Sequence, residues 1–324
     1  MIVLANEAQK QVRKATRAAY GVTLAELADS GLPIVAVDAD LSGSTTTKTF
    51  ATSKPEYADR MFNVGIAEQN MVDVAAGLSL AGNIAFTGSF AVFGTGRAYD
   101  QIRNTVCYGN LNVKVAPSHA GISVGPDGGS HQMLEDITLM RGLPNMRVLV
   151  PADYEAARSA IKIAALTPGP AYVRMGRASV PAVYAEGTEL ELGKAYVVRS
   201  GTDVSIIACG VMIDQALKAA DALAMRGVSA EVIDAFSLKP LDAETIVASV
   251  SKTGCAVTCE EHSIIGGLGS AVAEVLAKHH PAPIEFVGMN DCFGKSGEFE
   301  SLLTYFGMDA QAIVDAVERV RARL

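Results

Sequence analysis

Short apolar runs rich in β-branched residues alternate with segments of helical length along the first half of the chain. The runs that predict strands cover residues 34–40, 83–89, 112–119, 146–153 and 170–176. Two of the segments between and after them, residues 97–106 and 153–167, follow a helical pattern of apolar positions. This alternation is typical of a parallel sheet flanked by helices.

Ligands of such sheets gather at the carboxyl ends of the strands, so the polar residues that follow each strand are the first candidates for a site. These are Asp38, Asp40, Ser44, His119 and Arg174.

A break in the pattern near residues 180–192, where Pro181, Gly187 and Gly193 fall, predicts a linker. The alternation then restarts and ends in an amphipathic helix at residues 310–324. We therefore expect an α/β protein with two parallel-sheet, helix-flanked domains, at residues 1–185 and 186–324, and we find no strong internal repeat.

Composition narrows the class of protein. The 324 residues are 49% hydrophobic and only 19% charged, which favours a large core and some surface covered by another subunit. The net charge of −8 and the lack of a long basic run argue against nucleic-acid binding. The N-terminus shows no signal peptide, the apolar run at 71–93 is a poor membrane span, and the five scattered cysteines fit a reducing compartment, so we expect a cytoplasmic location.

Between Met61 and Phe93 the chain carries only two charged residues, Glu68 and Asp73. A carboxylate at the start of an apolar helix is either partnered for structural reasons or used in chemistry. The sequence leaves both readings of Glu68 open at this point.

A glycine-rich segment from His119 to Asp136 holds two of the five histidines together with Asp127. His119, His131 and this carboxylate suit proton transfer or recognition of a polyol. The spacing lacks the compactness of common zinc motifs, so we expect no metal ligands here.

Two further groups have both a structural and a functional interpretation. Phe90 and Phe93 are core residues or an aromatic slot for a planar ring. The arginines near strand ends are surface ion-pair residues or ligands for a phosphate group, and they are Arg17, Arg97, Arg174 and Arg177.

Taken together, these stretches resemble the transketolase family of thiamine-diphosphate enzymes over nearly the whole chain. The matching segments occur in family order and include "ATRAAYG", "DADLSGS", "FNVGIAEQN", "GSFAVFG", "RAYDQIR", "SHAGISVGPDGGSHQ", "VLVPAD", "YVRMGR", "EEHSIIGGLGS" and "FGKSGEFESLLTYFG". The resemblance covers the family's pyrimidine-binding and C-terminal domains.

The family's first domain binds Mg²⁺ and the diphosphate through a Gly-Asp-Gly motif that this chain lacks, and the chain starts where the pyrimidine-binding domain is expected to start. The resemblance therefore implies the C-terminal subunit of a split transketolase, with the Mg²⁺ ligands on a separate N-terminal subunit and a heterotetramer as the assembly. It implies a two-carbon ketol transfer from a ketose phosphate to an aldose phosphate.

The resemblance also assigns roles to individual residues. Glu68 matches the glutamate that contacts N1′ of the aminopyrimidine, and Asp40 matches an acid near the thiazolium. Phe90 and Phe93 match the pyrimidine slot, whose further aromatic is replaced here by Gly96. His119 and His131 match catalytic histidines. The substrate-binding positions are matched by Arg17, Ser44, His119, Asp127, His131 and Arg174.

Three alternatives stay open. "GIAEQN", with Ala67 where full-length transketolases usually have Arg, and "RAYDQ" favour a deoxyxylulose-phosphate-synthase-like half, whereas His119 stands where that family has Arg. A 2-oxoacid dehydrogenase β-type subunit is not expected to show "GPDGGSHQ". A silent regulatory subunit would not need to retain Glu68, Asp127, His131 and the cations.

Overall fold

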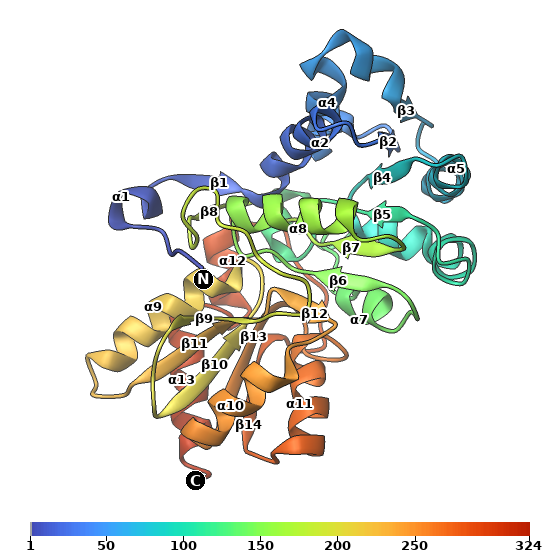
Figure 1. The fold of residues 1–324 in the computed structure, drawn as a ribbon. Coiled ribbons are helices and arrows are strands. Elements are labelled where there is room, and N and C mark those ends of the chain that lie inside the picture. Colours follow the sequence, from blue (N-terminus) through green and yellow to red (C-terminus); the bar gives the residue numbers. More distant parts are fainter. Residues whose placement is uncertain (1) are drawn as a thin grey trace.

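A computed structural model describes residues 2–324 and shows two large sheets, one mainly from each half of the chain, and a small two-stranded sheet (Figure 1). The first sheet has seven strands. In spatial order they are β12 (Ser237–Lys239), β6 (Arg147–Leu149), β7 (Ala171–Val173), β5 (Val113–Val115), β4 (Ile84–Gly88), β2 (Ile34–Asp38) and β3 (Met61–Asn63). All neighbours run parallel except β12, which is antiparallel to β6.

Helices cover both faces of this sheet, which is why β2 and β4 consist entirely of buried residues. The helices of this half of the chain after the short exposed helix α1 (Glu7–Lys10) are α2 (Ala19–Asp29), α3 (Ser42–Thr45), α4 (Thr47–Ser53), α5 (Glu68–Leu80), α6 (Tyr99–Gln101), α7 (Asp136–Arg141) and α8 (Tyr154–Leu166). Shorter 3-10 turns lie at η1 (Thr16–Ala18), η2 (Pro55–Arg60) and η5 (Ile122–Asp127), and wider π turns at η3 (Val92–Arg97) and η4 (Ile102–Cys107).

The helix predicted at 153–167 forms because its apolar positions face the core and because Asp153 caps it. The Asp153 carboxylate accepts a hydrogen bond from the Ala156 amide at 2.8 Å. The helix predicted at 97–106 differs from expectation, since α6 is a single turn between the π turns η3 and η4. π turns are rare in proteins, and those that occur are often found at functional sites.

The second sheet has five strands. In spatial order they are β14 (Ile284–Met289), β13 (Ala256–Ser263), β10 (Val204–Ala208), β11 (Ala230–Asp234) and β9 (Tyr196–Arg199). Only β9 runs antiparallel to its neighbour. The surrounding helices are α9 (Met212–Ala224), α10 (Ala243–Thr253), α11 (Leu268–His279), α12 (Phe299–Tyr305) and α13 (Ala310–Arg321). The predicted class, α/β with mostly parallel, helix-flanked sheets, is confirmed.

Two segments depart from the sequence-based expectation. β12 belongs to the second half of the chain but extends the first sheet, so the two halves share a sheet edge. The segment predicted as a linker begins with β8 (Ser179–Pro181), which pairs with β1 (Arg13–Ala15). Farther along it, Val183 and Leu190 are buried, so the segment is anchored to the core at these points, while Glu186 and Gly187 are exposed between them.

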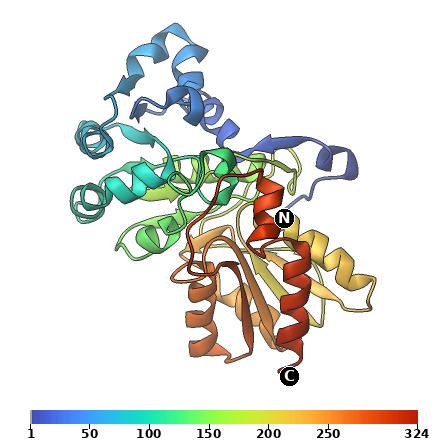
Figure 2. The same ribbon diagram turned by 180° about the vertical axis from the view of Figure 1, so that it is seen from behind.

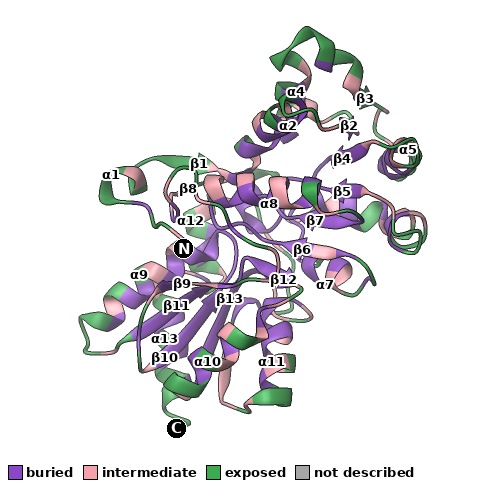
Figure 3. Ribbon diagram, viewed as in Figure 1, coloured by how far each residue is buried: buried purple, intermediate pink, exposed green. Residues whose placement is uncertain are grey.

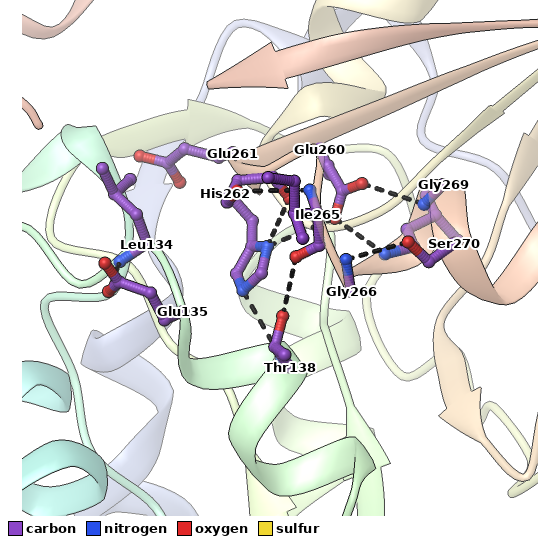
Figure 4. Close-up of polar contacts among 12 residues, drawn as sticks. Leu134, Glu135, Thr138, Glu260, Glu261, His262, Ile265, Gly266, Gly269 and Ser270 are labelled. Carbon is purple, nitrogen blue, oxygen red and sulfur yellow. Dashed lines mark hydrogen bonds and ion pairs between the residues drawn. The ribbon is translucent and has the colours of Figure 1, made fainter. Parts of the chain in front are cut away.

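Polar contacts also join the two halves (Figure 4). The Ser263 amide donates to the Leu134 carbonyl at 2.9 Å, and the Thr138 hydroxyl donates to the Ile265 carbonyl at 2.9 Å. Figure 3 shows buried residues continuing through this junction. In residues 2–324, no helix has the length and apolar character needed to cross a bilayer.

Candidate active site

Glu68 is the first residue of α5, and its carboxylate is buried with 2% of its surface exposed. Its partner is Arg97, whose Nη1 donates to Glu68 Oε2 at 2.9 Å. The Arg97 side chain is half-exposed. The buried acid is therefore held by a cation that solvent can still reach.

The π turn η3 brings Arg97 and Phe93 together, because its wide coil places both on one side. The Arg97 guanidinium lies 4.6 Å from the centre of the Phe93 ring. The ring of Phe93 is nearly parallel to that of Phe90, with centroids 6.3 Å apart and planes 13° apart. The two aromatic residues predicted to form a slot do lie together, next to the buried carboxylate.

Both predicted histidines adjoin these rings. The His119 ring stacks on Phe90 with centroids 3.8 Å apart, and the His131 ring meets Phe93 edge-on at 5.4 Å. His119 Nδ1 lies 2.7 Å from the Ser118 hydroxyl. Burial, followed by the positive charges of Arg17 and Arg177, lowers the pKa of His119 to about 3, so this imidazole is neutral at physiological pH.

Arg17 and Arg177 lie beyond His119. Arg17 Nη1 donates to the Ser44 carbonyl oxygen, and Arg177 Nη1 donates to the Val124 carbonyl oxygen. Burial and then the charge of Arg177 lower the pKa of Arg17, so two cations share a confined space. A cavity of about 450 Å³ is lined by both side chains, together with Arg13 and Ser123. The same cavity is also lined by Glu298 and Glu300, and Arg13 Nη2 lies 3.3 Å from Glu300 Oε1. Arg17 and Arg177 are therefore the cations in this cavity that form no ion pair with a carboxylate of residues 2–324.

The assignment of Arg174 to the substrate site needs correction. Its guanidinium is 6% exposed and pairs with the fully buried Asp136, with Nε 2.7 Å from Oδ2. A second bond runs from Nη2 to the Glu261 carbonyl at 2.8 Å. These partners occupy the side chain and make Arg174 part of the junction between the two halves. Arg177, three residues later, lies beside Arg17 instead.

The remaining predicted site residues, Asp40 and Asp127, are exposed and form no hydrogen bond or ion pair with the rings or arginines described above. Asp40 is exposed, has a left-handed backbone with φ of 65°, and accepts a hydrogen bond from Asn63 Nδ2 at 3.0 Å. Asp127 is exposed at the end of η5. Gly96 leaves open space where the family has an aromatic ring, and Tyr99 packs against a core cluster that contains Met71.

The structure therefore forms one row of side chains, each in contact with or in the electrostatic field of the next. From the buried acid to the cations, the row is Glu68, Arg97, Phe93, His131, Phe90, His119, Arg17 and Arg177. Within residues 2–324 no group of three or more His, Cys, Asp or Glu side chains is placed to hold a metal ion. The row brings together a buried carboxylate, two nearly parallel aromatic rings, two imidazoles and two neighbouring guanidinium groups.

Sequence reasoning does not pair Arg97 with Glu68 or place Arg177 beside Arg17. Both were among the arginines noted near strand ends, but the pattern does not reveal which of them share a pocket. A signal was present in the spacing of "VRMGR", because the first arginine directly follows β7 and the second is three residues farther on.

Family models match both halves of the chain. The pyrimidine-binding domain of transketolase matches residues 13–182, and the C-terminal domain of transketolase matches residues 193–313.

Individual proteins agree with these matches. A protein from Methanocaldococcus jannaschii that carries the name of a transketolase C-terminal section is 46% identical, over 94% of this chain and 96% of its own. A 6-deoxy-6-sulfo-D-fructose transketolase subunit from Clostridium sp. strain MSTE9 is 42% identical, over 95% of this chain and 94% of its own. A solved split-gene transketolase, an inactive β4 tetramer, superposes with a TM-score of 0.85 at 49% identity, covering 95% of this chain and 98% of its own. The chain belongs to the transketolase family and carries that family's pyrimidine-binding and C-terminal domains, which confirms the resemblance seen in the sequence.

Proposed function

We propose that this chain is one subunit of a heteromeric transketolase, which moves a two-carbon ketol unit from an anionic ketose to an aldose phosphate. The observation that carries the proposal is the row from Glu68 to Arg177. It joins a buried acid, an aromatic slot and an anion pocket, and the residues for Mg²⁺ and the diphosphate are left to a second subunit.

The slot fits the pyrimidine end of thiamine diphosphate. Phe90 and Phe93 offer parallel ring faces, and the buried Glu68 carboxylate lies on the neighbouring helix. When bound, this cofactor supplies the nucleophilic carbon that carries the ketol unit. Glu68 holds a proton at N1′ of the pyrimidine, and the low exposure of its carboxyl keeps water from competing for that proton. Arg97 keeps the carboxylate paired when no ring is there.

The other end of the row binds the sugar. Arg17 and Arg177 meet the terminal anion, and relief of their mutual repulsion favours a phosphate or sulfonate there. His119 and His131 lie between this pocket and the slot, where they contact the sugar hydroxyls. Ser44 and Asp127 bind the substrate at the edge of the site, and Asp40 lies near the thiazolium. The neutral imidazole of His119 can donate or accept a hydrogen bond without adding charge.

A separate N-terminal subunit with the Mg²⁺-diphosphate domain is part of the proposal, as is an assembly of two copies of each chain. The split-gene relative supports it, because that structure is described as a split-gene transketolase in the form of an inactive β4 tetramer. Exposed apolar side chains at Phe62, Ile66 and Leu80 flank Glu68 and α5, and they support a covering subunit on this face.

The test begins with affinity purification of the tagged chain from its own host and identification of a co-purifying chain with the Gly-Asp-Gly motif. The two chains are then produced together and assayed for glycolaldehyde transfer, with and without Mg²⁺ and thiamine diphosphate. Donors are xylulose 5-phosphate, fructose 6-phosphate and 6-deoxy-6-sulfofructose, with ribose 5-phosphate as acceptor. Transfer by the complex supports the proposal, and equal transfer by the single chain contradicts the need for a partner.

A further inference from the structure

The loop that carries both histidines, residues 118–132 and here termed the histidine loop, packs directly against the C-terminal domain. Its backbone is unfavourable in isolation at His119, which has a φ of 61°, whereas Gly121 adopts a φ of 75° without strain. A left-handed backbone is costly for a residue other than glycine and persists only where surrounding groups impose it. The question is which groups impose this one.

The first such group is Glu261, near the end of β13. Its Oε1 accepts a hydrogen bond from the Ser123 amide, and its carboxyl carbon lies 2.3 Å from where a Cβ at Gly121 would stand. The carboxyl is 2% exposed, and Oε2 has no hydrogen-bond partner among the described residues. Arg174 Nη1 lies 3.8 Å from Oε2.

The second is the segment before α12, Phe293–Glu298, here termed the strap. Figure 2 shows this red segment rising from the C-terminal sheet to the other half of the molecule. The strap's Lys295 carbonyl accepts a hydrogen bond from Gln132 Nε2 at 2.9 Å, while the same Nε2 donates to the Ile122 carbonyl at 3.2 Å.

Steric contacts show how close the strap lies to the histidine loop. A Cβ at Gly128 would meet Ser296 Oγ at 2.4 Å, and one at Gly129 would meet the Gly294 carbonyl oxygen at 2.7 Å. From the other side, a Cβ at Gly294 would lie 1.7 Å from Gln132 Oε1. The histidine loop therefore has no room to move toward the C-terminal domain.

We propose that Glu261 and the strap form a clamp by which the C-terminal domain, which supplies no residue of the row itself, fixes His119 and His131 for substrate binding. Glu261 is a positioning residue in this scheme. The inference rests on the proposed function for its catalytic consequence, whereas the clamp on the loop is a property of this chain alone.

Glu260 offers a matched control. It is as buried as Glu261, with 1% exposed, but its carboxylate accepts from the Leu268 and Gly269 amides at 2.7 and 2.8 Å, at the start of α11. Glu260→Ala thus removes a buried carboxylate from the same strand without touching the histidine loop. On the strap, Gly294→Ala presses on Gln132, while the Cβ of Gly297→Ala would meet Leu302 at 3.1 Å, a residue of α12.

The first measurement is hydrogen–deuterium exchange of the full-length single chain, which requires no activity. We expect faster exchange across residues 118–132 in Glu261→Ala and Gly294→Ala, and wild-type exchange there in Glu260→Ala, Gly297→Ala and Glu261→Gln. The Gln variant keeps an oxygen for the Ser123 amide. Equal protection of the loop in Glu261→Ala and Glu260→Ala would overturn the clamp.

The second measurement is transfer kinetics of the reconstituted complex. We expect Glu261→Ala to lower kcat/KM about tenfold or more, mainly through KM, with rescue by Glu261→Gln and little change in Glu260→Ala. Faster loop exchange with unchanged kinetics would refute the positioning role. If the wild-type complex transfers no ketol unit, the proposed function fails, while the exchange data still decide the clamp.

Discussion

Replacing Arg174 by Met tests whether this arginine is a structural residue or a phosphate ligand. The substitution removes the guanidinium but keeps much of the side-chain volume, and it leaves Asp136 fully buried with only the Tyr172 hydroxyl and the more distant His262 near its carboxylate. Breaking one partner of a buried ion pair costs about 3–5 kcal/mol, because the remaining charge stays desolvated. For a chain of 324 residues, whose unfolding entropy is about 0.7 kcal/mol/K, that corresponds to a fall in Tm of roughly 4–7 °C.

The assay is differential scanning calorimetry of wild type, Arg174→Met, Asp136→Asn and the double variant. We expect the double variant to cost less than the sum of the two single variants by about 1–3 kcal/mol, because removing both charges leaves neither unpaired. A Tm within about 2 °C of wild type, together with a raised KM for the phosphorylated donor alone, would restore Arg174 to the substrate site and refute the buried-pair argument.

Four further outcomes are expected. Arg177→Ala should raise KM for anionic donors, at a loss of about 1.5–3 kcal/mol in binding, and leave Tm near wild type; an equal effect on an uncharged ketose donor such as xylulose would count against the anion pocket. His119→Gln should flatten the stability–pH profile, because the folded pKa of about 3 lies below the ordinary 6.5. Wild-type stability therefore falls as pH drops from 6.5 toward 3, by up to about 1.4 kcal/mol per pH unit. If the urea midpoint fell equally in both proteins between pH 7 and pH 5, this role of His119 would be disproved. Glu68→Gln should abolish turnover while size-exclusion chromatography still shows the complete assembly, and near-normal kcat would exclude the proton-holding role. Arg97→Ala should retain assembly and tighten thiamine diphosphate binding to the complex in calorimetry, since it frees Glu68 from the partner that competes with the pyrimidine, and unchanged affinity would show that the pair has no part in cofactor binding.

The sequence predicted most of the first sheet, because buried parallel strands leave continuous β-branched runs such as those at 34–38 and 84–88. It also singled out Glu68 as a residue with a partner or a function, since a carboxylate in an apolar run needs one or the other. It did not identify Arg97 as that partner. The two residues are 29 positions apart and meet only through the π turn, which has no recognisable local pattern.

Arg174 was misassigned for a related reason. Spacing can place a residue just after a strand, but it cannot show whether the side chain turns into the protein or toward the ligand edge. The outcome here depends on Asp136 and Glu261, which come from other parts of the chain. β12 was missed because its sequence continues the pattern of β11, and nothing local indicates that it joins a different sheet.

The shared edge formed by β12 has a consequence for any attempt to dissect the protein. A fragment ending near residue 185 would lose β12 and expose β6 as a free edge with unpaired backbone amides and carbonyls, which is a template for aggregation. It would also lose the Glu261 partner of Arg174. The complementary fragment would carry β12 with no strand to pair with. The boundary between the two family domains is therefore a poor place to cut this chain, and its two halves are expected to unfold together.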